Sequence, residues 1–192
     1  LDTSPDTVQM AHGGGGRLTQ KLINTMFLPH FANEILNQQG DGAVLTAGSQ
    51  KLAFSTDSYV VKPLFFPGGD IGTMAVSGTV NDLAMMGAVP KYLSLGLIIE
   101  EGFSLTMLNT VVESIAREAD KAGVQVVTGD TKVVDKGHGD GLYINTSGIG
   151  VIEHAQKIDP QQIKVGDKII LSGVIGRHGL YILSQREGLG FH

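Results

Sequence analysis

Apolar positions recur at helical spacing in three stretches of the chain, and each stretch predicts a helix. The clearest lies between Ser104, a suitable N-cap, and Gly123, a suitable terminator. Its apolar stripe consists of Leu105, Leu108, Val112, Ile115, Ala116 and Ala119. Residues 70–87 predict a second helix, capped by Asp70, whose small residues allow close packing. Residues 17–36 predict a helix that is broken at Pro29.

Shorter apolar or alternating runs predict strands at 52–61, 92–99, 124–128, 142–152 and 168–172, and a last helix is predicted over 177–187. Together these elements predict an α/β (α+β) fold. The polar stretch after Asp159-Pro160 is typical of a linker between domains. We therefore expect a glycine-rich loop and helix at 1–40, a main domain at 41–155, and at 156–192 the linker and the beginning of a second domain in which the chain is cut.

Composition narrows the function classes. The formal net charge is −5 and the sequence has no Lys/Arg-rich run, so nucleic acid and anionic lipid are not expected as partners. The longest apolar run is too short to cross a bilayer, so no membrane span is expected. The chain contains no cysteine, which excludes thiolate chemistry within these residues and fits a reducing compartment. Its start resembles no signal peptide and lacks Met, so we expect a trimmed beginning and a cytoplasmic protein.

Glycine is enriched, with 27 of 192 residues, and four glycines follow one another directly after His12. The segment His12-Gly13-Gly14-Gly15-Gly16 precedes the first predicted helix, where free backbone N–H groups could cradle phosphate. It has neither the Lys-Ser/Thr of a P-loop nor the spacing of a dinucleotide fingerprint, so a flexible lead-in loop is the alternative.

Three isolated aspartates interrupt or end apolar elements: Asp57, Asp82 and Asp130. A buried carboxylate needs donors or cations, and Mg²⁺ shared with nucleotide phosphates would bring the three together. The alternative is that Asp57 and Asp130 lie in turns and that Asp82 hydrogen-bonds within its helix.

Lys132 follows Asp130 by two residues, so on an extended segment both side chains would face one side and could offer a metal ligand and a cation for phosphate. A solvated lysine is the alternative. Asn81 beside Asp82 could donate a hydrogen bond to a phosphate or simply occupy its helix.

Five segments in this order resemble the HypE family of hydrogenase-maturation proteins, within the aminoimidazole ribonucleotide synthetase-like (PurM-like) superfamily. They are His12-Gly-Gly-Gly-Gly, Phe54-Ser-Thr-Asp-Ser-Tyr, Pro63-Leu-Phe-Phe-Pro-Gly-Gly-Asp-Ile-Gly, Asn81-Asp82-Leu-Ala and Thr128-Gly-Asp-Thr-Lys-Val-Val. The resemblance runs from about residue 8 to the end. It implies a PurM-like N-terminal domain with a mixed sheet packed by helices, two copies pairing through their sheets, and the start of a second α/β domain.

The resemblance also implies an activity. Members of that family carry a carbamoyl group on the sulfur of a C-terminal cysteine and use ATP to dehydrate it to a thiocyanate, the source of the cyanide ligand of [NiFe] hydrogenase. That cysteine lies outside this chain, so this fragment alone is expected to be inactive. The implied partners are a second copy, the carbamoyltransferase HypF and the HypC–HypD complex.

Matching motifs imply that ATP and Mg²⁺ are the cofactors. Asp57, Asp82 and Asp130 would hold the metal, and Asp82 and Lys132 would take part in the chemistry. The residues implied in nucleotide binding are His12, Gly13, Gly14, Gly15, Gly16, Asp57, Asn81, Asp82, Thr128, Gly129, Asp130, Thr131 and Lys132.

Two other functions remain open at this point. One is another ATP-dependent PurM-like enzyme acting on selenide, thiamine monophosphate or a purine precursor. The other is a non-catalytic assembly module. Arg177 departs from the acidic residue expected there in relatives, and its effect has no explanation in the sequence.

Overall fold

The computed structural model describes residues 7–156, 158–176 and 179. Its centre is a five-stranded mixed sheet in the order β1-β2-β7-β5-β6, in which only β5 and β6 run parallel. The strands are β1 (Ala43–Ala47), β2 (Gln50–Tyr59), β5 (Val89–Glu100), β6 (Gln125–Val134) and β7 (Leu142–Ile152). A two-stranded ribbon of β3 (Phe65–Phe66) and β4 (Gly69–Asp70) precedes the long helices.

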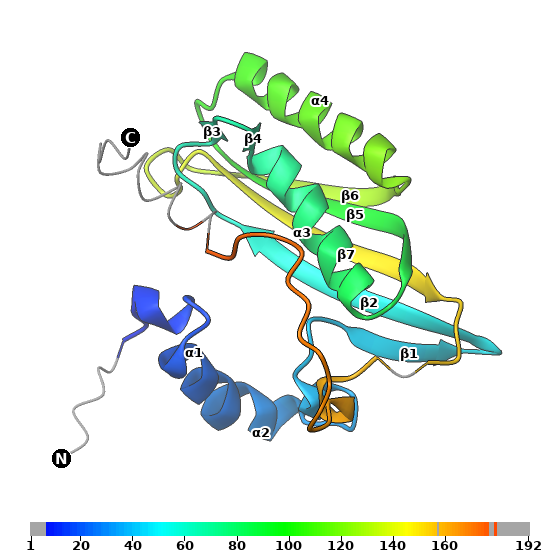
Figure 1. The fold of residues 1–192 in the computed structure, drawn as a ribbon. Coiled ribbons are helices and arrows are strands. Elements are labelled where there is room, and N and C mark those ends of the chain that lie inside the picture. Colours follow the sequence, from blue (N-terminus) through cyan, green and yellow to red (C-terminus); the bar gives the residue numbers. More distant parts are fainter. Residues whose placement is uncertain (1–6, 157, 177–178, 180–192) are drawn as a thin grey trace.

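Two long helices cover one face of this sheet, as Figure 1 shows. α3 (Ile71–Met85) begins at Asp70, whose carboxylate accepts the N–H of Thr73, and α4 (Leu105–Ala122) begins at Ser104, whose hydroxyl accepts the N–H of Met107. α4 ends at Gly123, which adopts the left-handed conformation (φ 67°). Both predicted caps and the predicted terminator are confirmed.

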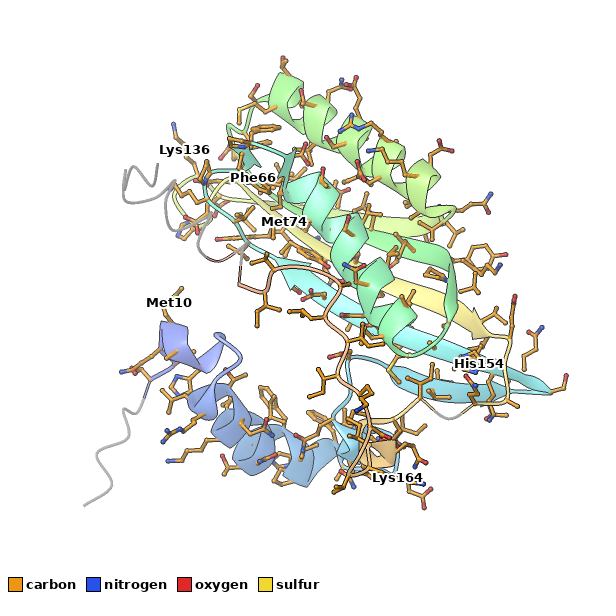
Figure 2. The ribbon with its side chains drawn as sticks, viewed as in Figure 1. Met10, Phe66, Met74, Lys136, His154 and Lys164 are labelled. Carbon is orange, nitrogen blue, oxygen red and sulfur yellow. The ribbon has the colours of Figure 1, made fainter. Side chains whose placement is uncertain are left out.

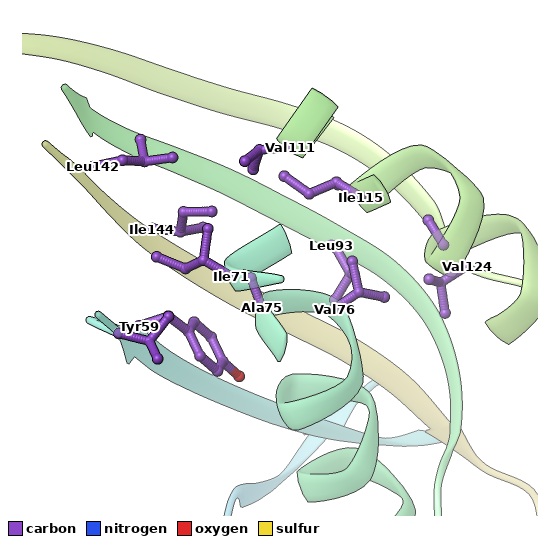
Figure 3. Close-up of a cluster of buried hydrophobic side chains, with 12 residues drawn as sticks. Tyr59, Ile71, Ala75, Val76, Leu93, Val111, Ile115, Val124, Leu142 and Ile144 are labelled. Atoms are coloured by element: carbon purple, nitrogen blue, oxygen red, sulfur yellow. The ribbon is translucent and has the colours of Figure 1, made fainter. Parts of the chain in front are cut away.

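The core lies between these helices and the sheet (Figure 3). Its fully buried side chains come from every layer: Ile71, Ala75, Val76, Leu93, Val111, Leu142 and Ile144. Phe66 and Met74 pack against the same cluster at the β3–β4 end (Figure 2). Gly72 lets α3 and α4 approach closely, because a Cβ there would lie 2.7 Å from the carbonyl oxygen of Val111. The predicted close packing of the small residues of α3 is therefore confirmed.

The helix predicted at 17–36 forms from Arg17 to Phe31 and is not broken at Pro29, because the backbone stays helical through a wider turn just before that residue. Figure 1 shows this segment apart from α3 and α4. A short turn (Met10–His12) precedes α1 (Arg17–Leu22), a wider turn (Ile23–Phe27) and α2 (Leu28–Phe31), and Pro29 lies at the start of α2. A further short turn (Leu36–Gln38) leads into β1. None of the helices in the described ranges is long and apolar enough to cross a bilayer.

Two further sequence predictions fail here, and one cannot be compared. The short strand β1 was not predicted, and no strand forms at 168–172, where Ile169 and Ile170 are almost fully exposed. A strand needs partners, and none of the described segments pairs with this one. The predicted linker holds only a short turn (Pro160–Gln162). The helix predicted at 177–187 lies outside the described residues except for residue 179, and the unexplained Arg177 lies outside them.

Candidate functional site

Asp82 lies in the last turn of α3, where the helix meets β2. Its Oδ2 accepts a hydrogen bond from the hydroxyl of Ser55, a buried residue of β2, over 2.9 Å. The same hydroxyl lies 2.9 Å from the carbonyl oxygen of Asp41, so the two acceptors share one donor. Asp82 is thus hydrogen-bonded to the strand beneath its helix. The alternative, in which Asp82 hydrogen-bonds within its own helix, is wrong for Oδ2.

The pKa of the Asp82 carboxyl is raised above its ordinary value. Burial is the main cause, because it removes water from the charged form, and the negative charges of Asp57 and Asp41 raise the pKa further. The hydrogen bond from Ser55 acts in the opposite direction. Three carboxylates therefore share one region and repel one another, and a cation placed among them would relieve the repulsion.

Asp57 lies near the carboxyl end of β2, on the face of the sheet that the helices cover. It pairs with Thr146 of β7, and cross-strand partners share a face. Thr146 is buried under α3, where its hydroxyl donates to the carbonyl oxygen of Ala75 over 2.9 Å. Unlike Thr146, Asp57 has an exposed side chain. Its carboxylate accepts a hydrogen bond from the backbone N–H of Ser58.

Asp130 and Lys132 lie on the opposite face. Across β6, β5 and β7, Asp130 pairs with Gly96, which pairs with Asn145. In the same way, Lys132 pairs with Ile98, which pairs with Tyr143. Asn145 neighbours the helix-facing Thr146, so its own side chain points to the face that the helices leave open. Asp130 and Lys132 share that open face, as the two-residue spacing predicts, and both are exposed.

The expectation that Asp57, Asp82 and Asp130 meet around one ion is not met within a single chain. β2 and β6 are three strand spacings apart, about 14 Å at the usual separation, and Asp57 and Asp130 lie on opposite faces. Among the described residues, no three acidic or histidine side chains are close enough to hold a metal ion. The alternative of turn acids is also wrong, because Asp57 and Asp130 lie within strands.

The remaining residues of the predicted β6 motif divide between the two faces. Thr128 pairs with Ser94 and faces the open side, whereas Gly129 and Thr131 pair with Leu95 and Leu97. Gly129 is required by close approach, because a Cβ there would lie 2.4 Å from the carbonyl oxygen of Leu95. Asn81, beside Asp82 on α3, is exposed.

The predicted phosphate loop at 12–16 lies before α1, and Figure 1 shows α1 apart from α3, the helix that carries Asp82. The His12 ring is engaged locally, since its Nδ1 lies 3.0 Å from the backbone nitrogen of Gln9. Gly15 has a positive φ of 73° and open space around it. Gly13, Gly14 and Gly16 complete an exposed turn. These five residues do not approach Asp82 in this arrangement of the chain.

A cavity of about 620 Å³ opens beside the Asp82 region. Its walls come from the segment around Phe31 and Leu36 on one side and from Ala43, Leu45 and Phe54 on the other. Asp41 and Ser55, the two neighbours of Asp82, also line it. Largely apolar walls with a few polar groups are typical of a site for a small molecule.

A second cavity of about 500 Å³ lies on the open face of the sheet. Asp130 and Lys132 line it together with Ser58, Tyr143 and Asn145. Sequence reasoning missed Asp41, Ser55, Tyr143 and Asn145 as neighbours of the predicted residues. No local signal could have revealed them, because each is brought there by strand pairing or by the turn before β1.

Curated relatives resemble the chain along its whole length. Carbamoyl dehydratase HypE of Azotobacter vinelandii is 52% identical over 191 residues, covering 100% of this chain and 56% of that protein. Carbamoyl dehydratase HypE of Escherichia coli is 50% identical over 190 residues, covering 96% of this chain and 56% of that protein. The chain thus spans about half the length of the curated relatives it matches.

Solved structures agree with these relatives. A HypE–HypF complex matches with a TM-score of 0.83 and 48% identity over 88% of this chain and 55% of that one. HypE in complex with ATP matches with a TM-score of 0.63 and 49% identity over 97% of this chain and 55% of that one. Residues 39–152 match the family AIR synthase related protein, N-terminal domain. The chain therefore belongs to the AIR synthase related family, and its similarity to HypE proteins extends along its whole length.

Proposed function

We propose that this chain is the nucleotide-binding half of a cytoplasmic ATP-dependent carbamoyl dehydratase that serves [NiFe]-hydrogenase maturation. The observation that carries the proposal is the Asp82 carboxyl, whose pKa is raised by burial and by Asp57 and Asp41 beside a cavity of about 620 Å³. Mutually repelling carboxylates, one of which, Asp41, lines a cavity, suit a metal-bound triphosphate. The resemblance to proteins named carbamoyl dehydratase HypE supports the substrate class.

The residues present fit Mg²⁺. Asp57 and Asp82 offer two of the hard oxygen ligands that this ion prefers, and oxygen atoms of the nucleotide phosphates would supply others. When bound, Mg²⁺ would neutralise charge on the nucleotide phosphates. Asp130 belongs to the predicted metal set but lies on the other face, so we assign it to the site of a second copy of the chain.

The cavity beside Asp82 suits the base of ATP. Phe31 offers an aromatic surface, and the segment from Gly40 to Gly42 presents backbone groups at the wall. An ATP complex of a protein 49% identical to this chain supports the choice of nucleotide. We propose that the 12–16 loop closes over the bound nucleotide, with Asn81 of this chain and Thr128, Gly129 and Thr131 of a second copy beside the phosphates.

ATP would supply a phosphoryl group that turns the oxygen of the S-carboxamide into a leaving group. The balanced change is loss of that oxygen and of both nitrogen protons, which converts the S-carboxamide to an S-cyanide and releases ADP and phosphate. Lys132 would stabilise charge spread over the transferring group. Asp82, whose raised pKa brings its titration closer to neutral pH, would accept a nitrogen proton.

A homodimer would complete this site. The open face of the sheet exposes apolar side chains from three adjacent strands: Phe54 (39%), Tyr92 (47%), Ile98 (44%) and Ile149 (40%). Phe54, Ile149 and Tyr92 form one row across the sheet. Pairing two copies through this face would bury the row and bring Asp130 and Lys132 of one copy to the other. One site would then lie beside the part of β2 beyond Phe54, which β1 leaves unpaired, and would contain Asp57 and Asp82 from one chain and Lys132 from its partner.

The partners follow from the same proposal. A complex of a protein 48% identical to this chain with HypF supports HypF as the source of the carbamoyl group. The HypC–HypD complex would receive the cyanide. The cysteine that carries the carbamoyl group would lie in the remainder of the parent protein, which we propose completes the second domain begun at 156–192.

The two other functions are less well supported. Thiamine monophosphate kinase of Aquifex aeolicus matches with a TM-score of 0.54 but only 18% identity, which indicates a shared fold alone. A non-catalytic module has no step that requires a carboxyl with a raised pKa, such as that of Asp82.

The test uses the full-length parent protein with its terminal cysteine carbamoylated. Incubation with ATP and Mg²⁺ should release ADP and phosphate while the protein loses the mass of one water. ATP hydrolysis without that mass loss would contradict the proposed reaction.

A further inference from the structure

The loop between β6 and β7 must cross the end of another strand. Because β5 lies between β7 and β6 in the sheet, residues 135–141 pass over the carboxyl end of β5. The last residue of β5 is Glu100. Figure 2 marks this end of the sheet by Lys136, a residue of the loop.

Glu100 binds both halves of the crossing loop. Its Oε1 accepts the N–H of Gly137 over 2.6 Å, and its Oε2 accepts the N–H of Gly141 over 3.0 Å. The N–H of Glu100 in turn donates to the carbonyl oxygen of Gly141 over 2.8 Å. Both glycines have positive φ, 87° and 91°, so their N–H groups are directed by a backbone that other residues rarely adopt. One carboxylate thus fastens the loop where it leaves β6 and where it enters β7.

The two strands that this loop joins carry opposite walls of the open-face cavity. Lys132 on β6 and Tyr143 on β7 flank Ile98 on β5, two residues before Glu100. The Tyr143 hydroxyl accepts the N–H of Asp140, a loop residue, over 3.0 Å. The loop is therefore tied to the cavity wall at Tyr143 and to β5 at Glu100.

We infer that Glu100 is a positioning residue that holds Lys132 at the correct distance from the β7 wall. The inference rests on the proposed function, in which Lys132 contacts nucleotide phosphate. A carboxylate suits this position because each oxygen accepts one N–H, whereas the NH₂ of glutamine can only donate. Releasing one end of the loop would let β6 and β7 shift, and a displacement of about 1 Å can cost on the order of 100-fold in rate.

The test measures binding of a non-hydrolysable ATP analogue, with Mg²⁺, to the full-length parent protein. Glu100→Gln should raise the dissociation constant about 10-fold and speed amide hydrogen exchange at Gly137 and Gly141. Glu101→Gln is the matched control, because this neighbouring side chain is exposed and makes no hydrogen bond or ion pair with any described residue. Its dissociation constant should stay within about 2-fold of wild type. Glu100→Asp, whose shorter side chain cannot reach both N–H groups, replaces the first variant if that variant unfolds.

A double-mutant cycle separates positioning from general damage. In a Lys132→Ala background, Glu100→Gln should weaken binding by less than about 2-fold, because the group that it positions is gone. Equal weakening in both backgrounds, or no weakening in the wild-type background, would overturn the inference while leaving the proposed function intact. Unchanged binding by Lys132→Ala would overturn the proposed function and the inference with it.

Discussion

The Ser55 hydroxyl on β2 donates a 2.9 Å hydrogen bond to Oδ2 of Asp82 on α3 and so joins the helix that carries the proposed base to the strand beneath it. This bond lowers the pKa of Asp82, whereas burial and the charges of Asp57 and Asp41 raise it more. The net rise means that the folded chain favours the protonated form of Asp82. Ionised Asp82 therefore reduces stability at neutral pH.

We predict that Asp82→Asn raises the melting temperature at pH 7 by about 1–3 °C. The variant removes a charge that is desolvated and close to two other carboxylates. The sign follows from linkage: the raised folded-state pKa of Asp82 makes stability fall as the pH rises from the unfolded value of 3.8 through the folded one. The gain should shrink as the pH falls below 3.8, where Asp82 becomes protonated in the unfolded state as well. A lower melting temperature at pH 7 would show that the charge is already compensated.

The substitution Asp82→Asn, which should raise stability, should lower the rate of dehydration. In the full-length parent, Asp82→Asn and Lys132→Ala should each lower dehydration at least about 100-fold, because one removes the proposed base and the other a phosphate-binding charge. Analytical ultracentrifugation should find dimers for both. Normal turnover by both variants would refute the assignment of these two residues.

The cavity beside Asp82 provides a test of base recognition. Phe31→Ala should weaken ATP binding about 10-fold and leave tripolyphosphate binding unchanged, because only ATP carries a ring that stacks on this side chain. Phe27→Ala is the matched control, since Phe27 lies in the same helical segment and does not line the cavity. Equal loss for both ligands would place the base elsewhere.

Close packing of α3 on α4 predicts a cost for any side chain at Gly72. Gly72→Ala would place a Cβ 2.7 Å from the carbonyl oxygen of Val111, so the helices must separate. We expect a loss of about 1–3 kcal/mol in urea unfolding. Gly16→Ala, which meets nothing within 4 Å, should change stability by less than about 0.5 kcal/mol. Equal stability of the two variants would contradict this packing.

Local signals predicted the helices and the longer strands, because caps and periodicity act within a few residues. Ser104, Gly123 and Asp70 function as their sequence contexts indicate. The two-residue spacing also placed Asp130 and Lys132 on one face. The sequence could not reveal that this face is the opposite one from Asp57, because it depends on the strand order and on the register between β2, β7 and β5. Asp41 was missed for the same reason, since the turn that brings it to Asp82 has no local signature.

Mixing two inactive variants tests the central claim that each site takes Asp82 from one chain and Lys132 from its partner. Full-length Asp82→Asn and Lys132→Ala proteins would be unfolded, mixed in equal amounts and refolded together. Half of the dimers would then be hybrids with one intact site of two, so the mixture should regain about one quarter of wild-type dehydration activity. A mixture that forms hybrid dimers yet stays inactive would place both residues in a site within one chain and contradict the account.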